Sequence, residues 1–279
     1  MNVWIITEFT LREALRRRVM LAAGVITFGF LVLYAVGVWF GWRDLQTDAD
    51  ITGITRAAIV GLMLQGGMWS LNFVASLLAI FLAVGAISGE IAQGTMHAVA
   101  ARPVRRAEIV LGRYLGYVVM LAGFIGVSSA AVIVTVVLIT GQVGGRVWAT
   151  PFLMLFGAAI LLAITVAGSA RFGTLANGVV VFSLFATGLM GGVIEQIGGF
   201  LDNPVMFDIG IATSVLLPSR AMWELASSQL AADTSVGSEF AAGPFGSFNP
   251  PSAWMLLVGS LYLAAMLGLA LRTFGRRDI

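Results

Sequence analysis

The chain has 279 residues, of which 59% are hydrophobic and only 11% charged, with a mean hydropathy of +0.96 and a formal net charge of +2. Soluble domains carry about a quarter charged residues, so this composition predicts an integral membrane protein with spans of roughly 20 residues. The chain has no cysteine, which excludes disulfides and thiolate metal sites, and no lysine, which excludes a Schiff-base lysine and a standard P-loop. Its single histidine is His97. We expect no catalytic residue, metal or cofactor.

Residues 2–18 predict an amphipathic helix that lies in the headgroup layer before the first span. Leu11 and Leu15 share one face, and Glu8 precedes Arg12 by four residues, the favourable order for a helical ion pair. A plain positively charged flank that orients insertion is the alternative.

Six segments are long and apolar enough to cross a bilayer. They cover about 19–42, 68–88, 114–140, 151–170, 174–194 and 253–271. The uncharged stretch 57–88 is too long for one simple span, so we expect Gln65-Gly66-Gly67 to mark an outer helix or a tilt. Pro151 suits the first turn of the fourth span. The first segment exceeds a signal-peptide core of about 7–15 residues and predicts an uncleaved span.

The arginines predict the orientation through the positive-inside rule. With a cytoplasmic N-terminus, 12 of the 16 lie inside: Arg12, Arg16, Arg17, Arg18, Arg102, Arg105, Arg106, Arg113, Arg171, Arg272, Arg276 and Arg277. Nine of the 14 acidic residues fall outside. The prediction is a multi-pass protein of the cell membrane with both termini cytoplasmic.

The outer connection, residues 195–252, predicts short helices followed by a loop. Pro218 breaks its apolar part, with Ser219 as a possible cap for a second helix, and the piece up to Leu217 is a candidate re-entrant segment. Residues 232–252 are rich in glycine and proline and predict turns. A passive connector is the alternative.

The most charged segment, residues 89–113, joins spans two and three. Glu90 suits the start of a short helix because a carboxylate is stabilised at a helix N-terminus, and Gln93 and His97 follow on the same side. Arg102-Pro103 ends this helix, since the residue before a proline is pushed out of α geometry. Topology alone also explains an arginine-rich inner loop, so that simpler reading stays open.

A second helix is predicted to begin near Pro103 and to run into the third span. It places Arg105, Arg106 and Arg113 near the headgroups. Gly112 and Gly116 lie four residues apart and predict a face for close helix packing.

This pattern resembles that of type-2 ABC transporter permeases. The matching positions are Glu90, Gly94-Thr95, Arg102-Pro103, Arg105-Arg106, Glu108 and Gly112-Arg113. The stretches 216–223 (LLPSRAMW) and 272–277 (RTFGRR) are similar to a subgroup that includes permeases of nitrous-oxide-reductase maturation clusters. The resemblance covers the whole length in topology, and its motifs are concentrated in about 25 residues.

The resemblance implies an all-α integral membrane protein with six transmembrane helices in one domain, 1–279. It implies the permease subunit of an ATP-driven transporter, as a homodimer or with a related chain, bound to two soluble P-loop ATPase subunits. Residues 2–18 would be its elbow helix. A cytoplasmic coupling helix would dock on the ATPase through Glu90, Gln93, Gly94, Thr95, His97, Arg102 and Pro103.

Other functions fit less well. An ion-coupled secondary transporter is expected to carry ionisable residues within its spans, and none of the six predicted spans has one in its middle third. An intramembrane protease needs paired aspartates, a Ser/His dyad or a metal site, which the spans lack. A non-transporting anchor, assembly or sensor protein that holds an extracytoplasmic partner through 195–252 is the main alternative. No nucleic-acid partner is expected. The uncharged spans favour a hydrophobic or amphipathic substrate and export.

Overall fold

The computed structural model describes residues 3–16, 18–47, 52–89, 106–142, 146–230 and 251–276, and these residues form helices and short connections without strands. Six helices have the length and hydropathy to cross a membrane. They are α2 (Arg18–Thr47), α3 (Gly53–Ala83), α6 (Arg106–Thr140), α7 (Ala149–Arg171), α8 (Thr174–Phe200) and α12 (Trp254–Gly275). This confirms the predicted all-α membrane fold with six spans.

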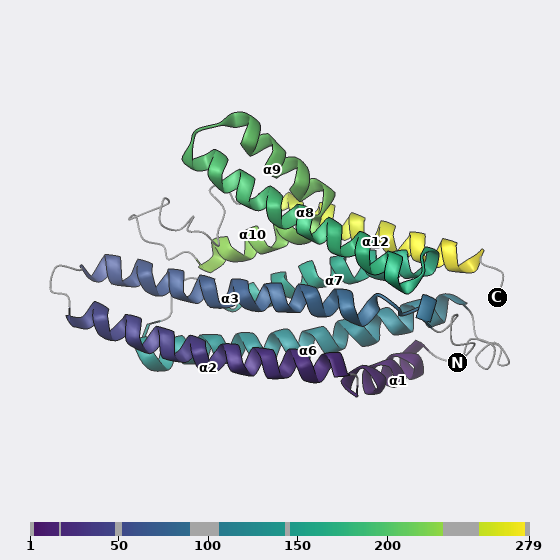
Figure 1. Cartoon of the computed structure of the whole chain (residues 1–279), viewed down its shortest axis with the longest axis horizontal. Helices are drawn as coiled ribbons and strands as arrows, with labels where there is room; N and C mark the ends of the chain where they lie inside the picture. Colours follow the sequence, from purple (N-terminus) through teal and green to yellow (C-terminus); the bar gives the residue numbers. More distant parts are fainter. Residues whose placement is uncertain are drawn as a thin grey trace.

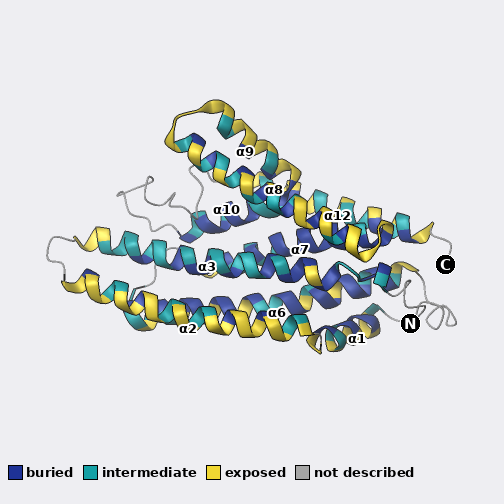
Figure 2. Cartoon of the chain, viewed as in Figure 1, coloured by how far each residue is buried: buried dark blue, intermediate teal, exposed yellow. Residues whose placement is uncertain are grey.

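The bundle is organised around α7, which packs against α3, α6, α10 and α12 (Figure 1). Small side chains along α7, including Ala158, Ala163, Ala167 and Ala170, are buried and allow its neighbours to approach closely. In contrast, α2 and α12 bury few of their side chains (Figure 2). Such apolar exposure is expected where lipid, not water, surrounds the helix.

Gln65-Gly66-Gly67 does not separate an outer helix from the second span, so of the two predicted alternatives, an outer helix or a tilt, the first is wrong. The helix α3 is continuous from Gly53 to Ala83, and the side chain of Thr52 accepts a hydrogen bond at its start. A Cβ at Gly67 would lie 2.6 Å from the Cζ atom of Tyr34 in α2. Glycine at this position therefore makes room for a neighbouring tyrosine ring and does not end the helix.

Two further helices, α9 (Pro204–Leu216) and α10 (Pro218–Leu230), are bent by 110° relative to each other. The prediction that Pro218 breaks this segment is confirmed, but the prediction that Ser219 caps the second helix is wrong. Proline fits the first helical position because its missing N–H would have no partner there, so α10 begins at Pro218 and Ser219 lies in its first turn.

Both described chain ends lie at one end of the bundle: α1 (Val3–Leu15) and the C-terminal end of α12 are close together in Figure 1. The helix α10 packs against α7 in the opposite half of the molecule.

Candidate functional site

The predicted ATPase-coupling residues, Glu90, Gln93, Gly94, Thr95, His97, Arg102 and Pro103, all lie in residues 90–105, outside the described residues. The predicted coupling helix and its roles stay predictions. What the structure does describe is the turn that enters this segment, residues 84–89, and the helix α6 that leaves it.

Gly112 and Gly116 of α6 lie directly against α1. A Cβ at Gly112 would be 2.6 Å from the Cβ of Ile6, and one at Gly116 would be 2.8 Å from the Cβ of Thr10. The hydroxyl of Thr7 donates a hydrogen bond to the carbonyl of Gly112 at 3.2 Å. The two glycines thus let the backbones of α1 and α6 touch.

The turn at residues 84–89 is held from α7 by Ser169, which is fully buried. Its Oγ accepts hydrogen bonds from the backbone N–H of Ile87 at 3.0 Å and of Ser88 at 3.2 Å. The hydroxyl of Ser88 also pairs with that of Thr174 at the start of α8, at 2.9 Å. The buried N–H groups of Ile87 and Ser88, which lie past the end of α3, thereby find an acceptor.

The same turn is held from α8 and α6. The Nδ2 of Asn177 donates to the carbonyl of Val84 at 2.9 Å and to that of Thr165 at 3.0 Å. The Nη1 of Arg113 donates to the carbonyl of Ala86. We call Arg113, Ser169 and Asn177 the turn clamp, because they fasten this turn to three different helices.

Arg113, which the sequence predicts to lie near the headgroups, is only 7% exposed, so protein encloses its guanidinium. Its acceptor is the carbonyl of Ala86 in the turn after α3, and the partial negative charge of a carbonyl oxygen stabilises a buried guanidinium. Asn177 is also tightly placed, because a Cβ at Gly168 would lie 2.1 Å from its Oδ1.

Arg106 fastens α6 to the end of α12. Its Nη1 donates to the carbonyls of Phe274 at 3.3 Å and Gly275 at 3.1 Å. A cation is favourable at a helix C-terminus because of the helix dipole. The entry to α6 is thus tied to the last described helix of the chain.

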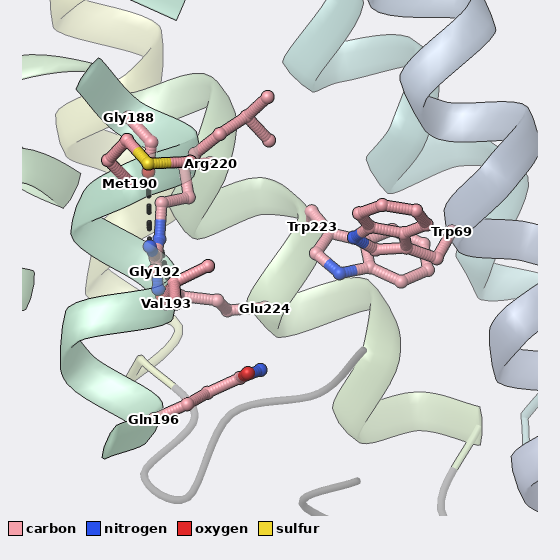
Figure 3. A pocket seen from close by; sticks show the side chains of 10 residues that line it. Trp69, Gly188, Met190, Gly192, Val193, Gln196, Arg220, Trp223 and Glu224 are labelled. Atoms are coloured by element: carbon pink, nitrogen blue, oxygen red, sulfur yellow. Dashed lines mark hydrogen bonds and ion pairs between the residues drawn. The ribbon is translucent and has the colours of Figure 1, made fainter. Parts of the chain in front are cut away.

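A second polar group, away from the chain ends, joins α8 to α10. Arg220 contacts Glu195 of α8 (Nη2 to Oε2, 2.8 Å) and Glu224 of its own helix (Nε to Oε1, 2.6 Å). Its Nη1 donates to the carbonyl of Gly188 at 3.1 Å (Figure 3). We call Glu195, Arg220 and Glu224 the Arg220 cluster.

The carboxylates of the Arg220 cluster are nearly excluded from solvent, each side chain being 6% exposed. Burial raises the pKa of Glu224 to about 7; Arg220 lowers this pKa and Glu195 raises it. With both carboxylates ionised the cluster carries a charge of −1, and a proton on Glu224 makes it neutral.

In the sequence, Glu195 and Glu224 counted only toward the orientation of the chain, and Arg220 only toward that orientation and the resemblance of residues 216–223. The spacing of Arg220 and Glu224 was a visible signal, because residues four apart share a helix face. Glu195 precedes Arg220 by 25 residues, and only the fold of α8 beside α10 brings it near. Among the described residues, no group of three or more His, Asp or Glu could hold a metal.

The six apolar helices, with polar contacts gathered in two places, define a multi-span helical membrane protein. The family model described as ABC-2 family transporter protein matches residues 4–279. The chain belongs to this family and is a membrane subunit of the ABC-transporter class, as the sequence resemblance predicted.

Two curated relatives carry the description "Probable ABC transporter permease protein NosY". The one from Pseudomonas aeruginosa is 32% identical over 133 residues, which cover 46% of this chain and 44% of the relative. The one from Stutzerimonas stutzeri is 31% identical over 153 residues, 53% of this chain and 51% of the relative. The chain thus spans about half the length of the curated relatives it matches.

Proposed function

We propose that this chain is the permease subunit of an ATP-driven exporter, that it dimerises, and that separate soluble P-loop ATPase subunits energise it from the cytoplasmic side. Both termini and residues 90–105 then lie in the cytoplasm. The family supports the transporter class, and the positive-inside distribution of arginine supports this orientation.

The observation that carries the proposal is the turn clamp. Residues 84–89 lead directly into the predicted coupling segment, and side chains from α6, α7 and α8 bind the backbone of this turn. A protein that pushes on residues 90–105 would therefore move three spans and not one loose loop. A loop that serves only to orient the chain during insertion needs no such attachment.

The absence of an ATP site in this chain supports a separate motor. A P-loop requires a lysine on the phosphates, and the sequence contains none. The charged side chains of the six spans lie within eight residues of a helix end, which speaks against a coupling ion bound at mid-membrane. A hydrophobic or amphipathic substrate is consistent with this apolar interior.

The test is co-purification with an ATPase subunit encoded beside the gene. We expect the pair Glu90→Arg and Arg102→Glu to weaken both the association and the ATP turnover of the complex. Glu8→Arg, a charge reversal on the exposed face of α1, is the matched control and should leave both unchanged. Unaltered association in the double variant would refute the coupling role of these residues.

A second variant separates docking from transmission. Ser169→Ala removes an acceptor for two backbone N–H groups of the turn but leaves residues 90–105 intact. We expect the ATPase to remain bound while stimulation of its turnover by the permease falls. If stimulation stays at the wild-type value, the turn clamp does not transmit motion.

A further inference from the structure

A cavity of about 250 Å³ lies between α3, α8 and α10, next to the Arg220 cluster. Its lining combines Trp69 of α3, Trp223 of α10 and the aliphatic side chains of Met190 and Val193 of α8 with the charged Glu224 (Figure 3). Known sites for drug-sized ligands measure about 300–1,000 Å³, so this cavity suits a small organic molecule. Such a mostly apolar lining with a few convergent polar groups is typical of ligand sites.

The charge of the cluster decides which ligands the cavity favours. The guanidinium of Arg220 is bonded to two carboxylates and to a backbone carbonyl. With both carboxylates ionised, the cluster carries a net charge of −1. An anionic ligand would have to displace one of these carboxylates, whereas a cation adds the missing positive charge.

The aromatic residues that line the cavity also favour a cationic ligand. The ring of Trp69 is stacked on Phe73, with centroids 6.1 Å apart and planes at 16°, which fixes its orientation. Trp223 is 7% exposed and lines the cavity from α10, on the same side as Trp69 and across from the α8 residues Met190 and Val193 (Figure 3). Indole faces attract cations through their quadrupole, more strongly where water is excluded.

A second, smaller space of about 40 Å³ adjoins the cavity and shares Trp69, Arg220 and Trp223 with it. It is lined further by Asn72 and Ser76 of α3, which add hydrogen-bonding groups beside the cavity.

We propose that this cavity binds a small organic cation with an aromatic or aliphatic body, the ammonium group facing Glu224 and the body lying against Trp69 and Trp223. The site does not depend on the ATP-driven mechanism proposed above, because binding is measured on the permease alone. If the cavity binds no cation, the coupling proposal is unaffected. If the coupling proposal fails, the cation-binding proposal is unaffected.

The test uses a pair of probes with the same shape and different charge. Benzyltrimethylammonium and neopentylbenzene differ only in that a carbon replaces the quaternary nitrogen, and benzylsulfonate supplies the anion. Calorimetric titration into the full chain in lipid nanodiscs, with empty nanodiscs subtracted, should show saturable binding of the ammonium alone. Equal binding of neopentylbenzene, or tighter binding of benzylsulfonate, would overturn the proposal.

Two variants locate the site. Glu224→Gln removes one negative charge and leaves Arg220 paired with Glu195, so the cluster becomes neutral; we expect affinity for the ammonium to fall about tenfold or more. Val193→Trp fills the cavity from a half-exposed position and should abolish binding without touching the cluster. Asp208→Asn, an exposed acidic residue on α9, is the control that should bind as the wild type does. Unchanged affinity in both cavity variants would place the cation elsewhere.

Discussion

Gly116→Ala should detach α1 from α6. The new Cβ would lie 2.8 Å from the Cβ of Thr10 and 3.0 Å from the carbonyl oxygen of Thr7. That oxygen belongs to the backbone, so no change of rotamer relieves the contact and α1 itself has to move. Forcing an extra carbon into a packed contact costs about 1–3 kcal/mol.

Gly126→Ala on the same helix is the matched control, because a Cβ there meets no atom within 4 Å. Replacing glycine by alanine within a helix gains about 1 kcal/mol from backbone propensity, and this gain applies at both positions. The difference between the two variants therefore isolates the contact with α1, about 1–3 kcal/mol.

A single cysteine reports on this contact, since the natural chain contains none. Ala14 of α1 is fully buried, so Ala14→Cys reacts with a maleimide only when α1 lifts away. The labelling rate should rise about 5- to 150-fold in Gly116→Ala relative to Gly126→Ala, because each 1.4 kcal/mol is a factor of ten in an equilibrium. Equal rates would show that the glycine contact does not hold α1.

Three further results are expected. Ser169→Ala should lower thermal stability by about 1–3 kcal/mol because two buried N–H groups lose their acceptor, whereas Ser129→Ala, whose buried hydroxyl has no hydrogen-bond partner, should be neutral or stabilising. Arg220→Met should lower the free energy of unfolding, measured by denaturant titration, by about 3–5 kcal/mol, since it leaves two buried carboxylates without their cation. Arg12→Met, from an exposed pair, should lower it by less than about 1 kcal/mol. Similar losses in the two variants would refute this reasoning. Asp208→Cys should react with a membrane-impermeant maleimide in intact cells, and labelling only after lysis would reverse the proposed orientation.

The fold was largely predictable because a bilayer permits few kinds of backbone structure to span it. Lipid offers no hydrogen-bond partners, so an uncharged stretch of about 20 residues must form a helix. The break at Pro218 was equally predictable, because a proline ring and its missing N–H disrupt the interior of a helix. The role of Gly67 could not be predicted, because it depends on Tyr34 of another helix. Local sequence does not show that contact.

The site was less predictable for the same reason. Arg113 follows the pattern of a headgroup-facing arginine, and only the turn after α3 beside it explains its burial. Asn177 could be recognised as a polar residue in a span, but its partners are Val84 in the turn after α3 and Thr165 in α7. A side chain that satisfies distant backbone groups carries no local motif.

The helix α8 connects the two polar groups, and it is the one described helix that contributes residues to both. Asn177 near its start belongs to the turn clamp, and Glu195 near its end belongs to the Arg220 cluster. Eighteen residues separate them, about 27 Å at 1.5 Å per residue. Since no charged side chain lies in the middle of the six spans, a displacement has to travel through packed helices. A shift of the turn at residues 84–89 along α8 would then reach the cavity beside Trp69 without any ion bound in the membrane.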